Sequence, residues 1–175
     1  VDPEGYDLRI FENPADLEKA IRRKDSQVEN SLARVIATFD WKYSSQHKNA
    51  EEDDGLWYVD VHHPTKQIRM PWNLQLSRGN QERRVAYRRA WSETPETINE
   101  VGSTYTIQGF DLNYSGVILG PSITYRDGRI VIDPSKSAHG KAVQRRQMAD
   151  GSKVSFGEQL IKNELNVLLT LSLIH

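Results

Sequence analysis

The chain of 175 residues contains no cysteine, which excludes disulfides, thiolate metal ligands and thiol nucleophiles. It also lacks an apolar run close to the ~20 residues of a membrane-spanning helix, and its N-terminus does not have the pattern of a signal peptide. We therefore expect a cytoplasmic protein with no membrane partner. The sequence does not begin with methionine, so we expect a fragment or truncated copy of a longer protein.

Both common glycine-rich phosphate-binding motifs, G-x-x-x-x-G-K-[ST] and G-x-G-x-x-G, are absent. No G-x-S-x-G sequence occurs either, so nothing indicates a serine hydrolase. The formal net charge of −1 argues against a protein that coats nucleic acid through its overall charge, although local basic patches can still bind. A hydrophobic content of 37% and a charged content of 27% fit one globular domain spanning residues 1–175.

The first part of the chain predicts a strand, a helix and a second strand. Residues 8–11 alternate as a short strand does, and Asn13-Pro14 predicts the start of a helix because asparagine caps and proline suits the first turn. Residues 33–39 form a mostly apolar run, which is typical of a parallel strand covered on both faces. These elements together predict a βαβ unit. The expected class is α/β, with three layers and a mostly parallel sheet.

The remaining patterns add strands, a hairpin and a last helix. Residues 56–61 have the aromatic and β-branched composition of a strand, and Asp127-Gly128 predicts a β-hairpin. Ser155 and Glu158 form a capping box before a helix with apolar residues at helical spacing. The polar segments 46–55 and 134–153 are expected to be mobile loops.

The stretch from Val101 to Gly120 predicts a strand, a polar turn and a second apolar strand, residues 116–119. Two interpretations of Thr106 and Gln108 in this turn stay open. Their side chains either satisfy backbone groups of a tight turn or contact a ligand at the carboxyl end of a parallel strand.

A basic cluster made of Arg83, Arg84, Arg88 and Arg89 precedes this stretch, with Tyr87 and Trp91 between and after the arginines. Such a combination suits phosphate contacts together with stacking on bases, which would make these arginines nucleic-acid-binding residues. The alternative is a solvated helix face with Tyr87 and Trp91 buried. Lys141, Arg145 and Arg146 form a weaker basic group of the same kind.

No metal site is predicted. The adjacent His62 and His63 would point to opposite faces of a strand and chelate poorly. A metal-dependent nuclease built from Asp60, Glu100 and Asp111 is a further hypothesis, but no ligand spacing supports it.

The turn Thr106-Ile107-Gln108-Gly109 resembles motif V of superfamily-one helicases and, more closely, the helicase-like proteins of the Schlafen group. In that family, V-G-x-x-[HT]-x-x-Q-G-[LF]-[ED] precedes an apolar strand G-V-I-[LI]-G-P, which is similar to residues 116–121 here. Further stretches agree with family segments and extend the resemblance from residue 8 to residue 170. They are residues 33–41 (A-R-x-x-A-x-x-x-W), 71–74 (W-N) and 129–136, the hairpin after motif V.

The resemblance implies the second RecA-like domain of a P-loop NTPase. A preceding N-terminal ATPase domain would hold ATP and magnesium, and this domain would close over the nucleotide and contact single-stranded nucleic acid. Thr106 would contact the phosphate backbone, and Gln108, Gly109 and Asp111 would couple that contact to the nucleotide. Tyr105 stands where the family often has histidine, and Asp111 where it usually has glutamate, whose carboxylate reaches one methylene further.

Residues 166–170 resemble the start of motif VI, V-L-L-T-R-G, whose arginine reaches the γ-phosphate of ATP. Leu171 stands in the arginine position, and loss of such an arginine typically costs ~10³ or more in rate. Either the C-terminal tail is non-native or this copy has lost the arginine. We expect no enzymatic activity from the chain alone. The alternative function is a stand-alone nucleic-acid- or protein-binding module without an ATPase role.

Overall fold

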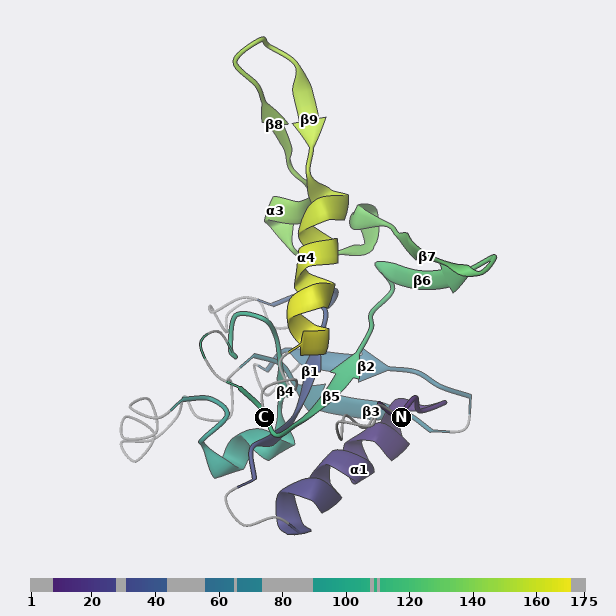
Figure 1. Ribbon diagram of the computed structural model, residues 1–175, viewed down its shortest axis with the longest axis vertical. Helices are drawn as coiled ribbons and strands as arrows, with labels where there is room; N and C mark the ends of the chain where they lie inside the picture. The colour runs from purple at the N-terminus through teal and green to yellow at the C-terminus, as the bar shows by residue number, and fades with distance from the viewer. Residues whose placement is uncertain are drawn as a thin grey trace.

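The computed structural model describes residues 8–27, 31–43, 56–64, 66–73, 90–107, 109 and 111–170, with only the backbone described at 141 and 142. This part of the chain has an α/β fold, with one parallel sheet and antiparallel hairpins around it (Figure 1). No helix in these ranges is long and apolar enough to cross a membrane.

The centre of the fold is a three-stranded parallel sheet in which β1 (Ala33–Ala37) lies between β4 (Val101–Gly102) and β5 (Tyr114–Ile118). Each residue of β1 pairs with one of β5. Every residue of β1 is buried, as expected of an apolar strand that is covered on both faces. The α/β class is confirmed, and so is a parallel strand within the predicted residues 33–39, although it ends two residues earlier, at Ala37.

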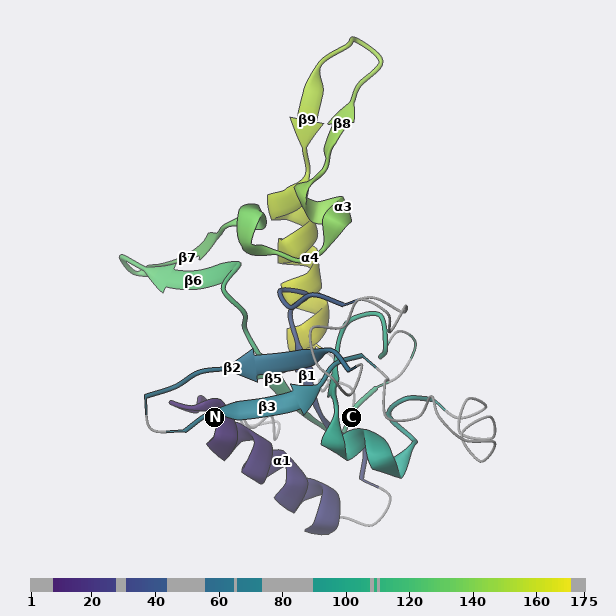
Figure 2. The ribbon, with the colours of Figure 1, turned by 180° about the vertical axis from the view of Figure 1, so that it is seen from behind.

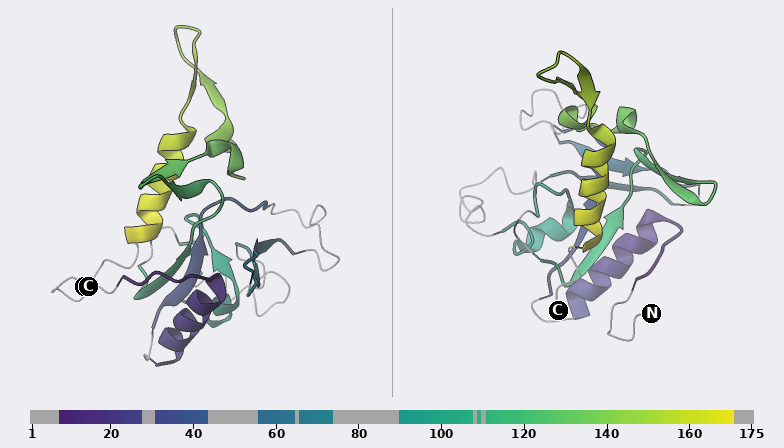
Figure 3. Two further views of the ribbon diagram at one scale, coloured as in Figure 1. Left: turned by 90° about the vertical axis from the view of Figure 1, so that its right-hand side faces the viewer. Right: turned by 45° about the horizontal axis from the view of Figure 1, so that its top comes forward.

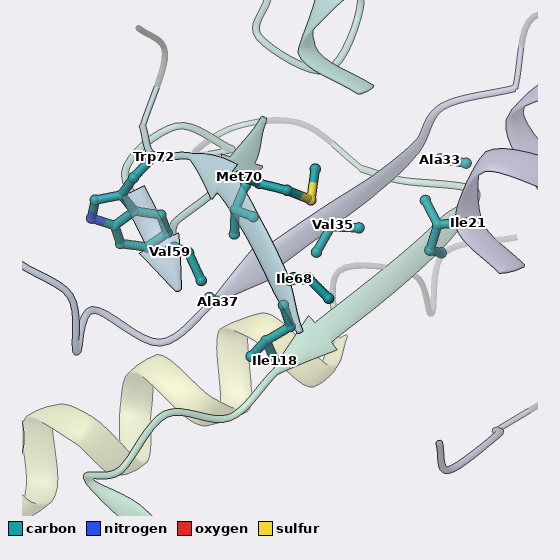
Figure 4. Packing of buried hydrophobic residues seen from close by; sticks show 10 residues of the cluster. Ile21, Ala33, Val35, Ala37, Val59, Ile68, Met70, Trp72 and Ile118 are labelled. Atoms are coloured by element: carbon teal, nitrogen blue, oxygen red, sulfur yellow. The ribbon is translucent and has the colours of Figure 1, made fainter. Parts of the chain in front are cut away.

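One face of β1 is covered by helix α1 (Pro14–Gln27) and by the hairpin of β2 (Tyr58–Val61) and β3 (Ile68–Pro71). Helix α1 starts as predicted, because Asn13 Oδ1 accepts a hydrogen bond of 2.9 Å from the backbone N–H of Asp16. Side chains from α1, the hairpin and the sheet share one cluster (Figure 4). Its buried residues are Ile21, Ala33, Val35, Ala37, Val59, Ile68, Met70, Trp72, Val101 and Ile118.

The opposite face of β1 is covered by helix α4 (Gly157–Thr170). Ile36 points away from Val35 because successive side chains of a strand alternate, and it packs in a second cluster with Leu168 of α4. The other buried members of that cluster are Trp91, Ile107 and Leu112. The sheet therefore lies between two covering layers, and the apolar face predicted for the C-terminal helix is confirmed.

Arg34 lies on the same face as Ile36 and is buried, beside the short 3₁₀ helix η2 (Pro95–Asn99). Its guanidinium donates to Thr97 Oγ1 at 2.9 Å, to Asp25 Oδ1 at 2.8 Å and to the carbonyl of Thr94 at 3.1 Å. A buried charge without such partners would cost several kcal/mol. Arg34 is therefore a structural residue that ties the helical segments to the sheet.

The predicted hairpin at Asp127-Gly128 joins β6 (Ile123–Arg126) and β7 (Arg129–Ile132). Both turn residues have positive φ, 51° and 76°, as a two-residue type I′ turn requires. Asparagine, aspartate and glycine tolerate this conformation, so the prediction from the dipeptide is confirmed.

Segment 134–153 contains regular elements, and its mobility stays a prediction. It holds η3 (Pro134–Lys136), α3 (Gly140–Val143), β8 (Arg145–Gln147) and the first residue of β9 (Lys153–Ser155). The β8–β9 hairpin projects away from the rest of the molecule, beyond the start of α4 (Figures 1 and 2). Segment 46–55 lies outside the described residues, so its mobility is not tested. That residues 1–175 form a single domain also stays a prediction.

The strand predicted at residues 8–11 is wrong. These residues are irregular, and Leu8 and Ile10 are exposed. Because β1 already has β4 and β5 on its two edges, the segment has no place beside it, and the predicted βαβ unit does not form. The strand predicted at residues 116–119 begins two residues earlier and ends one residue earlier than expected, as β5.

Candidate functional site at the carboxyl edge of the sheet

The carboxyl ends of the three parallel strands meet at one edge of the sheet, which is where open α/β sheets bind ligands. The segments that follow the strands are 38–41 after β1, 103–107 after β4 and 119–122 after β5. Helix α4 reaches the same edge. The residues that meet there, called the carboxyl-edge cluster below, are Thr38, Phe39, Asp40, Tyr105, Thr106, Gly120, Ser122, His139 and Glu164.

Asp40 is the centre of a hydrogen-bonded network that joins β1 to β5. Its Oδ2 accepts from the backbone N–H of Ser122 at 2.8 Å and lies 3.3 Å from Thr38 Oγ1, which itself accepts from the N–H of Gly120 at 2.8 Å. Oδ1 is buried and has no hydrogen-bond partner within the described ranges. Burial raises the pKa of Asp40, and the bonds from Ser122 and Thr38 oppose that shift.

Gly120 is required by the position of Asp40. A Cβ atom on Gly120 would lie 2.3 Å from Asp40 Oδ2 and 2.6 Å from Asp40 Cβ, closer than non-bonded atoms approach. The glycine therefore lets the end of β5 pass against the carboxylate.

Glu164 brings a second carboxyl group to the edge from α4. Its Oε1 accepts a hydrogen bond of 3.0 Å from the backbone N–H of Phe39. Burial raises the pKa of Glu164 to about 7, with the negative charge of Asp40 adding to the shift, while hydrogen bonds from Phe39 and Thr104 oppose it. Near neutral pH the two carboxyl groups therefore carry less than two negative charges.

Tyr105, Phe39 and His139 form an aromatic group at the same edge. The ring centroids of Tyr105 and Phe39 are 5.6 Å apart with the planes at 87°, and those of Tyr105 and His139 are 5.6 Å apart at 82°. The Tyr105 hydroxyl lies 2.7 Å from His139 Nε2. Although it is held on two sides, the Tyr105 side chain is 55% exposed. A fixed and exposed ring of this kind can stack against a planar ligand.

Thr106, predicted as a phosphate contact, lies beside Tyr105 at this edge. Its Oγ1 accepts from the backbone N–H of Ser103 at 2.7 Å and donates to the carbonyl of Ser103 at 2.9 Å. The turn interpretation accounts for this geometry. A phosphate contact stays a prediction, and it would require the hydroxyl proton to turn away from Ser103, since a phosphate oxygen only accepts.

The residues predicted to couple nucleic acid to nucleotide follow Thr106. Gly109 is exposed with φ of 87°, a left-handed conformation that glycine adopts without strain. Asp111 is exposed. Gln108 lies outside the described residues, so the coupling role of all three stays a prediction.

The basic cluster Arg83, Arg84, Arg88 and Arg89, together with Tyr87, lies outside the described residues. Trp91 is only 4% exposed, and its Nε1 donates to Glu100 at 3.0 Å in the second hydrophobic cluster. Stacking of a base on Trp91 is therefore excluded, and the alternative interpretation of this side chain as buried is correct.

The three carboxylates of the nuclease hypothesis are not brought together. Glu100 is fully buried beside Trp91, whereas Asp111 is exposed and Asp60 lies in β2. In the described part of the chain, no group of three or more histidine, aspartate or glutamate side chains is arranged to hold a metal ion. His62 is exposed and lies 3.5 Å from Asp60.

Sequence reasoning missed Asp40, His139 and Glu164. Asp40 carried a signal, because a carboxylate three residues after a buried parallel strand is placed at the ligand-binding edge. His139 and Glu164 carried none, since they come from distant segments that only the tertiary fold brings to Phe39 and Tyr105.

Comparison with known proteins agrees with the sequence motifs that resemble the helicase-like proteins of the Schlafen group. Residues 1–171 match the Schlafen group 3 DNA/RNA helicase domain. The chain is 31% identical over 169 residues to the uncharacterized protein YPL245W of Saccharomyces cerevisiae, across 95% of the chain but only 32% of the yeast protein. The chain thus spans about a third of the length of this relative, and no solved structure matches it. The chain belongs to the Schlafen group 3 DNA/RNA helicase domain family.

Proposed function

We propose that the chain is the second RecA-like domain of a helicase-like ATPase and that its carboxyl-edge cluster contacts single-stranded nucleic acid. The observation that carries this proposal is Tyr105, an exposed ring held by Phe39 and His139 beside Thr106. Stacking of a base on such a ring contributes about 1–3 kcal/mol and tolerates any sequence. Membership of a DNA/RNA helicase domain family supports nucleic acid as the ligand.

In this proposal Thr106 and the arginines at 83, 84, 88 and 89 contact phosphates next to the stacked base. Gln108, Gly109 and Asp111 transmit the contact to ATP and magnesium held by an N-terminal ATPase domain. The sequence of 175 residues contains no G-x-x-x-x-G-K-[ST] (Walker A) motif, so in this proposal the domain closes over a nucleotide that another domain binds.

Binding is tested by fluorescence anisotropy of a labelled single-stranded oligonucleotide at low and high salt. We expect Tyr105→Ala to weaken binding roughly tenfold, within the range expected for one stacked base. Tyr105→Phe keeps the ring and should bind like the parent. The matched control is Tyr125→Ala, which removes an exposed tyrosine from β6. Equal affinity of Tyr105→Ala and the parent, or no binding at low salt, would overturn the proposal.

The ATPase part has a separate test. The purified chain should hydrolyse ATP no faster than background in the presence of magnesium, because its sequence contains neither of the common glycine-rich phosphate-binding motifs. Robust turnover by a clean preparation contradicts the assignment as the second domain.

The second candidate function is a stand-alone nucleic-acid- or protein-binding module without an ATPase role. The observation that favours it is Leu171, an apolar side chain in the position where motif VI has its arginine. Leu171→Arg separates the two functions in a protein that also contains an ATP-binding domain. A gain in hydrolysis supports the ATPase role, whereas an unchanged rate with intact nucleic-acid binding supports the binding module.

A further inference from the structure

The β8–β9 hairpin, residues 145–155, is called the arm below. Every residue of the arm is exposed, and none belongs to a hydrophobic cluster of the described chain. The arm extends from the end of α3 and the start of α4 away from the sheet (Figures 1 and 3). An isolated two-stranded hairpin gains little stability for itself. The side chains of the arm are therefore available to a ligand and do not serve the hydrophobic core.

Strand pairing sorts the side chains of the arm onto two faces. Arg145 pairs with Ser155 and Gln147 pairs with Lys153, so these four side chains lie on one face because cross-strand partners share a face. Arg146 and Val154 form the other pair and lie on the opposite face. One face is thus entirely polar with two cations, and the other carries one cation beside an apolar side chain.

The arm is basic although the whole chain has a formal net charge of −1. Its cations are Arg145, Arg146 and Lys153, and its one carboxylate is Asp150 in the turn. Asp150 Oδ1 accepts from Ser152 Oγ at 2.6 Å and from Ser152 N at 2.9 Å, which lowers the pKa of Asp150 and uses that oxygen within the turn. The cations lie along the strands and the carboxylate stays at the tip.

We propose that the arm binds duplex DNA by entering its major groove. The groove is about 12 Å wide and admits a two-stranded ribbon. Arginine and lysine can contact phosphates on its walls, and the amide of Gln147 can hydrogen-bond base edges. Two other nucleic-acid ligands fit less well. The arm has no aromatic residue on which single-stranded bases stack, and the major groove of duplex RNA is too deep and narrow to enter.

This site is separate from the carboxyl-edge cluster and does not depend on the proposed ATPase role. A protein with both sites holds a duplex on the arm and a single strand at the sheet edge, which suits a junction between the two. If one of the two sites fails its binding test, the result for the other still stands, because Tyr105 is probed with a single-stranded oligonucleotide and the arm with duplex DNA.

The test compares the chain with the triple variant Arg145→Ala, Arg146→Ala, Lys153→Ala on a labelled duplex DNA. Loss of three phosphate contacts lowers the slope of log affinity against log salt by roughly 2–3, and weakens binding on the order of tenfold or more at low salt. Two controls are matched to it. Arg126→Ala with Arg129→Ala removes exposed cations from the other hairpin and should bind like the parent. Arg145→Lys with Arg146→Lys keeps the charge and should keep the salt slope.

The choice of probe separates the possible ligands. We expect the triple variant to lose affinity for duplex DNA, with a smaller loss on single-stranded DNA and on duplex RNA of the same sequence. Equal affinity of variant and parent for duplex DNA overturns the proposal. So does an arm-dependent binding of polyglutamate without binding of duplex DNA, which would indicate an acidic protein surface as the ligand.

Discussion

Strand β1 and the arm are both short β-structures, yet their side chains have opposite surroundings. All residues of β1 are buried between α4 on one side and α1 with β2–β3 on the other, whereas all residues of β8 and β9 are exposed. Burial of apolar side chains stabilises a fold by about 25 cal/mol per Å² of apolar surface. The buried side chains around β1 therefore stabilise the fold, whereas the arm carries exposed charged side chains that contribute little to its stability.

Most side chains of the carboxyl-edge cluster are intermediate in exposure between those of β1 and those of the arm. Asp40 and Glu164 are partly buried and accept hydrogen bonds from backbone groups, while Tyr105 in the same cluster is half exposed. Substitutions here should affect both stability and ligand binding, in proportions set by burial.

The largest effect on stability is expected from Leu168→Ala. Leu168 is fully buried against Ile36, so its truncation leaves a cavity between α4 and the sheet and should cost about 2–5 kcal/mol of the free energy of unfolding. The control is its neighbour Leu169→Ala, which is 41% exposed and should cost well under half as much. Urea denaturation followed by circular dichroism measures both. Equal losses would show that α4 does not cover the sheet in this orientation.

Gly120→Ala should destabilise by about 1–3 kcal/mol, since the added methyl overlaps Asp40 and the end of β5 must shift. The matched control is Gly140→Ala, where an added Cβ meets nothing within 4 Å. Thermal unfolding distinguishes the two variants. Addition of Asp40→Ala to Gly120→Ala should recover only part of the loss, because it removes the overlap with Asp40 Oδ2 at 2.3 Å and leaves the one with Asp40 Cβ at 2.6 Å. A neutral Gly120→Ala would contradict the close approach.

Local patterns in the sequence predicted those elements whose structure depends on neighbouring residues. Residues 33–37 carry enough apolar surface for a strand covered on both faces, and the Asn13 cap and the Asp127-Gly128 turn follow from backbone conformation alone. Their physical causes lie within a few residues of the chain, so a sequence pattern contains them.

Features that depend on the assembled fold were not predictable in this way. Residues 8–11 have a strand pattern, but both edges of β1 are taken, so pairing rather than propensity decided the outcome. Glu164 meets Phe39 across 125 positions of the chain. Its raised pKa arises from burial and from Asp40, and neither is encoded near residue 164.

The raised pKa of Glu164, in the carboxyl-edge cluster, makes the stability of the fold depend on pH. Since the folded-state pKa of about 7 exceeds the reference value of 4.5, the folded state holds the proton more tightly. The resulting stabilisation is complete below pH 4.5 and is lost as pH rises through about 7. Glu164→Gln cannot ionise, so it should be more stable than the parent at pH 8, by about 1–2 kcal/mol after allowance for its partial exposure.

Melting temperatures of the parent and Glu164→Gln, taken from pH 5 to pH 8, measure this difference. The advantage of the variant should shrink towards pH 5, where the parent carries the proton as well. Glu158→Gln removes an exposed carboxylate from the same helix and controls for the loss of one negative charge. A constant difference between parent and Glu164→Gln across this range would contradict a partly buried Glu164 that titrates near pH 7.

The smallest effect on stability is expected from the arm. The triple variant Arg145→Ala, Arg146→Ala, Lys153→Ala removes three long side chains that contact no hydrophobic cluster, so its free energy of unfolding should stay within about 0.5 kcal/mol of the parent. Urea denaturation under the conditions used for Leu168→Ala measures the change. A loss above about 1 kcal/mol would mean that the arm packs on the body in solution, and its cations would then act in the fold. An unchanged stability together with weakened duplex binding assigns those cations to a ligand, because the same substitutions then affect binding without affecting the structure.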